Sequence, residues 1–166
     1  MRHPSEDIFL NIIEEYKAIV YKIANLYART TEDQEDLFQE IIINLWKAYP
    51  SFKGHAKIST WIYQISLNTA ITNYRREKKK VRYESISMRS LNEIGAPSEE
   101  HEIDQLTILY QAVDDLHKID KAIVLLYLEQ KSYQEISQIM GMTVAATGMR
   151  IKRIKSKLAE RFAKMN

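Results

Sequence analysis

Residues 132–154 read SYQEISQIMGMTVAATGMRIKRI, and their pattern decides the fold class of the last third of the chain. Apolar residues recur every three or four positions before Gly141, as expected for a short amphipathic helix. Gly141 stands where a tight turn needs a residue without a Cβ, and Thr143 can cap the helix that follows. The buried side of this second helix, from Val144 to Phe162, is predicted to contain Thr147, Ile151, Ile154 and Leu158. A helix, a short turn and a second helix make a helix-turn-helix.

The outer face of the predicted second helix is basic, with Arg150, Lys152, Arg153, Lys155 and Lys157. In a DNA-binding helix-turn-helix the second helix enters the major groove, with early residues at base edges and basic residues on phosphates. The alternative is a helical hairpin that packs against a partner protein and whose lysines serve only to keep the surface soluble. DNA binding is favoured because the cap, the glycine turn, the short first helix and the one-sided basic stripe occur together.

The helix-turn-helix is expected at the centre of a helical module from Gln105 to Lys164. The helix preceding it is predicted from one apolar stripe, formed by Leu116, Ile119, Ile123, Leu126 and Tyr127. This spacing of three and four residues is typical of an amphipathic helix.

The composition of the whole chain fits a helical protein. Its 166 residues are 45% hydrophobic and include only four Gly and three Pro, which leaves few breaks for a strand-rich fold. Without cysteine there is no disulfide or thiolate metal site, and the four histidines show no ligand spacing. We therefore expect no cofactor and no metal. The chain also has no run of eighteen apolar residues and no apolar segment after Met1, so a soluble, cytoplasmic protein with no membrane insertion of its own is expected.

Charge is segregated along the chain although the net charge is only +2. Six basic residues and one acidic residue lie between Asn73 and Arg82, and seven basic residues and one acidic residue lie between Thr147 and Met165. Acidic residues cluster in turn between Glu32 and Glu40. Such segregation favours separate faces for separate partners, although a single run is also compatible with a solvated helix face.

The first half of the chain is predicted to hold three more helices. They run from Ile8 to Tyr27 with Ser5 or Asp7 as cap, from Thr31 to the residue before Pro50, and from a cap at Ser59 into the basic run. Acidic residues in the first turns of the second of these helices complement its dipole. Periodicity fades between Lys79 and Asp104, which indicates a linker. We predict an all-α protein of two small helical domains, residues 1–80 and 105–166, joined by a flexible linker at 81–104.

Five segments carry a resemblance to a known family. They are Asp36–Trp46 (DLFQEIIINLW), Ser51–Gly54 (SFKG), Ser59–Ile71 (STWIYQISLNTAI), Asn73–Arg76 (NYRR) and Ser132–Gly141 (SYQEISQIMG). In order and spacing they resemble regions two and four of an extracytoplasmic-function (ECF) sigma factor of the sigma-70 family, over nearly the whole chain. The resemblance implies a bacterial transcription initiation factor that binds core RNA polymerase, recognises minus-thirty-five and minus-ten promoter elements and nucleates promoter melting.

The resemblance also implies protein partners. The acidic second helix would dock on the clamp coiled coil of the polymerase β′ subunit, through Asp33, Asp36, Gln39, Glu40, Asn44 and Trp46. The second domain would meet the β flap of the polymerase. Some of the apolar residues Leu37, Ile41, Leu45 and Trp46 are expected to belong to the core instead. An anti-sigma factor, as a separate polypeptide, would regulate the protein.

For the minus-ten region, the resemblance implies a pocket for a flipped base at the Phe52–Ile58 loop with Asn68. The implied DNA contacts for this region and for melting are Lys53, His55, Lys57, Thr60, Trp61, Tyr63, Asn68, Arg75, Arg76, Lys78 and Lys79. The basic members would hold the upstream duplex by its phosphates, which makes binding salt-dependent. Trp61 stands at helical spacing from Ile65, so packing in the core is as consistent with its position as stacking on DNA.

For the minus-thirty-five region, the implied DNA contacts are Thr143, Met149, Arg150, Lys152, Arg153 and Lys155. The recognition helix departs from the family pattern at Ala146, Thr147, Gly148 and Met149, where other and often longer or polar side chains are usual. Readout is therefore expected to depend on Arg150, Lys152 and Arg153, or on DNA shape.

One alternative function is a two-domain helix-turn-helix regulator with an N-terminal sensing or dimerisation domain. It would need a ligand pocket or a self-complementary apolar face, whereas the first domain here carries its own basic run. An enzyme is not expected, because the sequence has no glycine-rich phosphate loop, no nucleophile elbow and no metal-ligand spacing.

Overall fold

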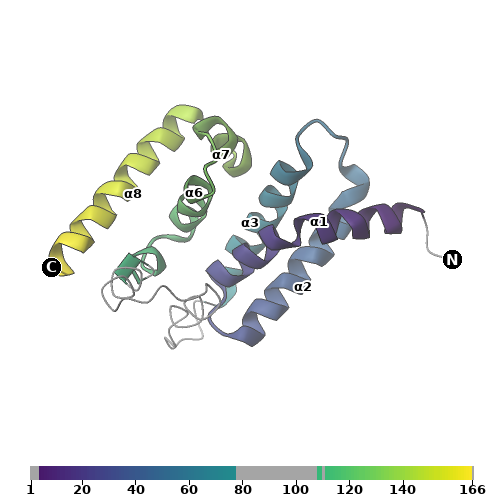
Figure 1. Cartoon of the computed structure of the whole chain (residues 1–166), viewed down its shortest axis with the longest axis horizontal. Helices are drawn as coiled ribbons and strands as arrows, with labels where there is room; N and C mark the ends of the chain where they lie inside the picture. Colours follow the sequence, from purple (N-terminus) through teal and green to yellow (C-terminus); the bar gives the residue numbers. More distant parts are fainter. Residues whose placement is uncertain (1–3, 78–107, 110, 166) are drawn as a thin grey trace, which may run out of the picture. The chain divides into compact units, whose positions relative to one another are not determined.

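The computed structural model describes residues 4–77, 108–109 and 111–165, and every regular element in these ranges is helical (Figure 1). The chain divides into two compact units, Met1–Tyr83 and Glu84–Asn166. The predicted all-α class with two helical domains is confirmed. The predicted linker, residues 81–104, lies outside the described residues, so its flexibility and the domain bounds stay predictions.

The described part of unit 1, residues 4–77, forms three long helices and one short turn. Its elements are α1 (Pro4–Tyr27), α2 (Thr31–Ala48), the 3-10 turn η1 (Tyr49–Ser51) and α3 (Ile58–Glu77). Each α-helix packs against the other two (Figure 1). The apolar stripes meet in a core whose fully buried members include Val20, Ile23, Ile41, Leu45 and Ile62. Burial of each such side chain contributes about 1.5–3 kcal/mol, which determines the faces that the helices turn to solvent.

The starts of these helices follow local capping chemistry, and two predicted caps are wrong. Helix α2 begins at Thr31 as predicted, and the Thr30 hydroxyl accepts a hydrogen bond from the Asp33 N–H at 3.0 Å. Helix α1 begins at Pro4, before both predicted cap residues, because a proline at the first position has no N–H left unpaired. Helix α3 begins at Ile58, one residue before the predicted cap Ser59, and the Trp61 N–H bonds the Lys57 carbonyl.

Unit 2 contains the helix-turn-helix. Its elements are α6 (Lys118–Leu128), α7 (Tyr133–Met140) and α8 (Val144–Met165), and residues 108–109 and 111–114 are also helical. A capping box opens α7, because Ser132 and Glu135 each bond the other's backbone N–H. Gly141 closes α7 at φ +67°, a left-handed conformation that disfavours residues with a Cβ. The predicted helix-turn-helix is confirmed.

Two details of unit 2 differ from the sequence-based expectation. Leu116 does not belong to the same helix as Ile119, because His117 caps α6 and the helix begins at Lys118. Leu116 is nevertheless buried, so it joins the core from the preceding turn. Helix α8 ends at Met165, three residues beyond the predicted Phe162. Of its four predicted buried residues, Thr147, Ile151 and Ile154 are buried, whereas Leu158 is only half-buried.

Ser66 of α3 is an unsatisfied polar group in the core of unit 1. Its side chain is fully buried and its hydroxyl has no hydrogen-bond partner. We expect Ser66→Ala to raise the free energy of unfolding by about 1 kcal/mol, because it removes a buried unpaired hydroxyl and introduces a better helix former. For a unit of this size the melting temperature of its transition should rise by about 4 °C or more.

The matched control is Thr69→Ala on the same helix. The Thr69 hydroxyl is also buried, but it donates to the Ile65 carbonyl at 2.8 Å and accepts from the Asn44 amide at 3.0 Å. This control should lower the melting temperature, since it removes satisfied hydrogen bonds. A lower melting temperature for Ser66→Ala in thermal unfolding monitored by circular dichroism would contradict the prediction.

Candidate functional site

The solvent-facing side of α8 lies opposite the side that packs on α6 and α7. Met149, Lys152 and Arg153 are exposed and spaced by three and four residues, which aligns them on one helix face. The Thr143 hydroxyl accepts a hydrogen bond from the Ala146 N–H at 3.1 Å and so holds the start of this helix. Two cations therefore stand on an outward face whose N-terminal end is anchored against α7.

Arg150 of α8 turns toward α6 instead of outward. Its Nη1 lies 3.4 Å from Asp120 Oδ1, and both atoms are buried and lack hydrogen-bond geometry, so they meet as an ion pair. A guanidinium held this way is a structural link between α6 and α8. This position does not favour the predicted direct readout by Arg150. Asp120 was not foreseen, because no periodicity relates it to a residue thirty positions away.

The pair predicts a measurable effect on stability. Asp120→Ala should lower the free energy of unfolding of unit 2 by about 2 kcal/mol, because the buried Arg150 nitrogen loses its counter-charge. The Arg150 side chain is 30% exposed, which places the expected loss below that of a fully buried pair. Chemical denaturation followed by circular dichroism measures this loss.

Asp115→Ala is the matched control, since it removes a second ion pair to the same helix. The pair of Asp115 with Arg161 has side chains 46% and 43% exposed. Exposed pairs contribute about 0.5 kcal/mol, so this variant should be nearly neutral. Equal losses for the two variants would show that burial does not distinguish the pairs.

Lys155, like Thr143 and Arg150, is a predicted DNA contact that also has a partner inside unit 2. Its Nζ lies 4.6 Å from the centroid of the Tyr127 ring, in cation–π geometry. A side-chain hydrogen bond with Tyr127 raises the pKa of Lys155, so the ammonium stays charged. Lys155 is exposed and keeps a cation at the edge of the outward face.

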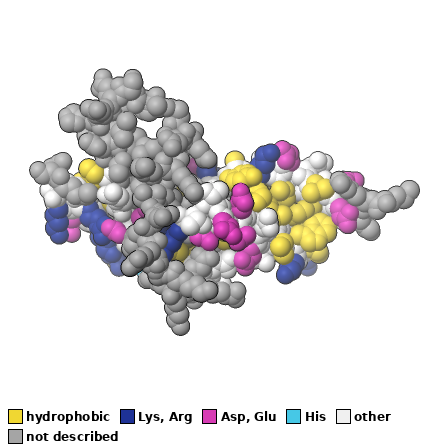
Figure 2. Space-filling model, turned by 90° about the horizontal axis from the view of Figure 1, so that it is seen from below, with side chains coloured by type: hydrophobic (Ala, Val, Ile, Leu, Met, Phe, Trp, Pro, Cys, Tyr) yellow, Lys and Arg dark blue, Asp and Glu magenta, His cyan; other side chains and the backbone are white. Residues whose placement is uncertain are grey.

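The outer face of α2 combines acidic and apolar side chains. Asp36, Gln39, Ile43 and Trp46 are exposed and spaced by three and four residues along one stripe. Ile43 is 51% exposed, and Trp46 is 41% exposed and packs edge-to-face with Phe9, with 4.9 Å between the ring centroids. Figure 2 shows acidic side chains gathered beside an area of exposed hydrophobic side chains. Ile43 was missed because an isoleucine in an apolar helix predicts core.

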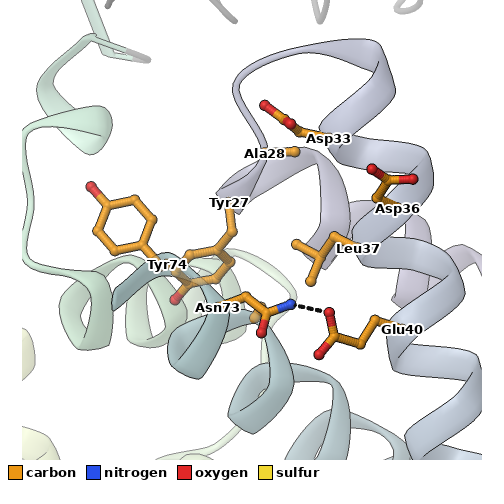
Figure 3. Close-up of a pocket in the computed structure, with 9 residues that line it drawn as sticks. Tyr27, Ala28, Asp33, Asp36, Leu37, Glu40, Asn73 and Tyr74 are labelled. Atoms are coloured by element: carbon orange, nitrogen blue, oxygen red, sulfur yellow. Dashed lines mark hydrogen bonds between the residues drawn. The ribbon is translucent and has the colours of Figure 1, made fainter. Parts of the chain in front are cut away.

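Two predicted docking residues, both half-buried, are hydrogen-bonded to α3, and their docking role stays a prediction. The Asn73 amide donates to the Glu40 carboxylate (Figure 3), and the Asn44 amide donates to the Thr69 hydroxyl. Glu40, Asn44, Asn73 and Thr69 therefore join two helices of the unit. Glu40 also lines a pocket of about 350 Å³, including space open to solvent, whose other labelled lining residues are Tyr27, Ala28, Asp33, Asp36, Leu37, Asn73 and Tyr74 (Figure 3).

The loop between η1 and α3 is anchored by aromatic packing. The centroid of the Trp61 ring lies 5.0 Å from that of Phe52 and 6.4 Å from that of Tyr49. The next residues are exposed and include Lys53, His55 and Lys57, around Gly54 at φ +74°. The chain thus presents a basic loop at the start of α3.

Three predicted strand contacts of α3 are buried. Thr60, Trp61 and Tyr63 are 9%, 9% and 3% exposed. Their burial favours packing roles, because a DNA contact needs an accessible side chain and a stacking platform needs an accessible ring face. Asn68, in contrast, is exposed two turns further along the helix.

The predicted phosphate contacts at the end of α3 are only partly described. Arg75 and Arg76 lie in the last turn of α3, but the structure describes only their backbone. Lys78 and Lys79 lie outside the described residues. All four stay predictions.

Comparison with protein families assigns both units. The family model for Sigma-70 region 2 matches residues 12–80, and the model for Sigma-70, region 4 matches residues 106–158. The ECF RNA polymerase sigma-E factor of Escherichia coli (strain K12) is 31% identical over 144 residues, which cover 79% of this chain and 75% of that protein. The chain belongs to the ECF sigma factors of the sigma-70 family. This sigma factor is also 29% identical over 161 residues to the ECF RNA polymerase sigma factor SigW of Bacillus subtilis (strain 168), with 89% and 85% of the chains covered.

Solved structures share the fold of this sigma factor. CnrH in complex with the cytosolic domain of CnrY superposes with a TM-score of 0.68 at 17% identity, over 97% of this chain and 91% of that chain. The sigma factor RpoE in complex with the anti-sigma factor NepR from Bartonella quintana gives 0.67 at 18% identity, over 92% and 97%.

Membership of this family gives the protein its general role in transcription initiation. Sigma factors are transcription initiation factors that bind RNA polymerase, and this chain has both regions that define the family. The match over residues 12–80 assigns the first domain to sigma region 2. The alternative function, a helix-turn-helix regulator, would need a sensing or dimerisation domain at that place. In the part of the chain that the structure describes, no helix is long and apolar enough to cross a membrane.

Proposed function

We propose that this sigma factor directs core RNA polymerase to promoters through two separate DNA-binding surfaces. Helix α8 reads the minus-thirty-five element, and the basic loop with Asn68 captures the minus-ten element and nucleates melting. The observation that carries the proposal is the presence of one exposed cationic surface in each unit: Lys152 and Arg153 on α8, and Lys53 and Lys57 beside α3. A regulator that binds only duplex DNA needs no second surface of this kind.

At the minus-thirty-five element, the exposed cations of α8 hold the duplex by its phosphates. Lys152, Arg153 and Lys155 supply these charges, while Thr143 and Arg150 hold the helix itself in position. Phosphate contacts of this type give salt-dependent binding and fix the register of the helix in the groove.

At the minus-ten element, Asn68 is the proposed base-reading residue. Its amide offers a donor and an acceptor to a base edge, and its exposure leaves the group accessible. Extruding a base costs a few kcal/mol, which contacts to the flipped base offset. The cations Lys53 and Lys57, with His55, hold the strand backbone near the loop. The cations of the basic run, from Arg75 to Lys79, are proposed to hold the upstream duplex.

The outer face of α2 is the proposed docking surface for the clamp coiled coil of the β′ subunit. Exposed acidic groups beside Ile43 and Trp46 fit a partner with basic and apolar side chains, since charge complementarity guides association and apolar anchors supply affinity. For the β flap we propose unit 2, where Tyr127 and Leu128 at the end of α6 are exposed apolar residues.

An anti-sigma factor is a further proposed partner. One solved structure with this fold holds the sigma factor RpoE with the anti-sigma factor NepR, and another holds CnrH with the cytosolic domain of CnrY. Such a partner would block the polymerase-docking or DNA-binding surfaces. Core polymerase and promoter DNA are cytoplasmic, so this is where we expect the protein to act.

Promoter selection tests the proposal directly. The purified chain is added to core polymerase, and specific transcripts are sought from a library of genomic fragments. We expect a complex with core and a set of transcripts that share two spaced elements. Absence of the complex, or transcription without a shared element, would refute the proposed function.

A further inference from the structure

The first two turns of α8 present apolar groups to solvent. Ala145, Ala146 and Met149 are all exposed, and Met149 is 68% exposed. Residues three and four apart are neighbours on a helix surface, so the two alanine methyl groups lie one turn before the Met149 side chain. These residues form what we call the apolar face, defined as Ala145, Ala146 and Met149.

The polar side chains of the same turns are engaged inside the unit. Thr143 caps the helix at Ala146, and Thr147 is fully buried with its hydroxyl donating to the Thr143 carbonyl at 2.9 Å. Arg150 is paired with Asp120. The early residues of a recognition helix are those that reach base edges, so the groups available there are mainly methyl groups and a thioether.

A cationic rim indicates what covers the apolar face. Lys152 and Arg153 follow Met149 by three and four residues and are exposed on the same side of the helix. Isolated exposed apolar side chains are ordinary on protein surfaces, but an apolar face bordered by cations complements a polyanion with apolar groups in its groove. Duplex DNA has this chemistry, because the thymine C5-methyl group projects into the major groove.

We propose that the apolar face, with Met149 as its largest side chain, reads the C5-methyl group of thymine in the minus-thirty-five element. The inference rests on the proposed function and adds the source of its specificity. The apolar face contacts the base edges, and the cationic rim of Lys152 and Arg153 contacts the phosphates. Small alanines let the helix approach the groove floor, and the flexible thioether fits against the methyl group.

Thymine-to-deoxyuridine replacement tests the proposal, because it removes only the methyl group. The holoenzyme is bound to a promoter obtained by selection, and each thymine of the minus-thirty-five element, on either strand, is replaced in turn. We expect one or two positions at which binding weakens about fourfold, as for the loss of one buried methyl contact. Met149→Ala should bind the thymine and deoxyuridine promoters equally, and Met149→Leu should retain the discrimination.

Lys152→Ala is the matched comparison on the rim. It should weaken binding to both promoters by the same factor and reduce the salt dependence. Thermal unfolding of Met149→Ala should match that of the parent chain, because the side chain is exposed. This separates a loss of contact from a loss of fold.

Several outcomes would overturn the inference while the proposed function stands. They are equal binding of thymine and deoxyuridine promoters at every position, unchanged discrimination in Met149→Ala, or a selected element without an A·T pair. Loss of core binding in Met149→Ala with unchanged discrimination would assign the face to a protein partner instead. Failure to select any promoter would overturn both the inference and the proposed function.

Discussion

Ile43→Lys is expected to weaken the complex of this sigma factor with core RNA polymerase at least about tenfold, or ~1.4 kcal/mol. Ile43 is half exposed at the centre of the outer face of α2, between Gln39 and Trp46. The change removes an apolar anchor and introduces a positive charge on a surface proposed to face basic side chains. Titration of labelled core polymerase measures the dissociation constant.

Ala18→Lys controls for the added charge. Ala18 is exposed on α1, and the same substitution type there changes the net charge equally without altering α2. Its complex with core should stay within about twofold of the parent, as expected of residues outside an interface. Thermal unfolding of both variants checks that the fold is kept. Equal affinities for Ile43→Lys and Ala18→Lys would remove α2 from the proposed docking surface.

Asn68→Ala should reduce open-complex formation about tenfold and leave closed-complex affinity within about twofold, a difference of ~1.4 kcal/mol between the two steps. The physical reason is that a base-capturing amide contributes only after the base has left the stack. Because Asn68 is exposed, its removal should not affect folding. Permanganate reactivity of unpaired thymines reports opening, and a gel-shift assay on ice reports closed binding.

Thr72→Ala is the matched control for Asn68. Thr72 is exposed one turn further along α3, on the same face of the helix. Its loss should leave both steps nearly unchanged. If Asn68→Ala lowers closed binding and opening by equal factors, base capture is not its role. A further variant, Asn68→Asp, keeps the acceptor oxygens and loses the N–H donor. It tests whether the base is bound by the donor or by the acceptor of the amide.

The sequence alone predicted the helix-turn-helix because its signals are local. A left-handed glycine and a threonine cap each act within one turn of the backbone, and both are confirmed, at Gly141 and Thr143. The Ser132 cap of α7 is equally local but was not predicted. Helix existence and type followed in the same way from apolar periodicity. Where the capping chemistry was ambiguous, boundaries were wrong by one to a few residues, as at Ser59 and Leu116.

Tertiary structure alone decided which predicted site residues are available to a partner. Arg150 meets Asp120, Glu40 meets Asn73, and Asn44 meets Thr69, across separations of 25 to 33 residues in the chain. Trp61 is buried while Ile43 is exposed, although apolar periodicity treats both as helix-face residues. Periodicity shows that a helix has a buried side, but burial and ion pairing depend on which neighbour packs there and at what angle. The local chain therefore determined the elements of this sigma factor, and the packing of helices distant in sequence determined its accessible chemistry.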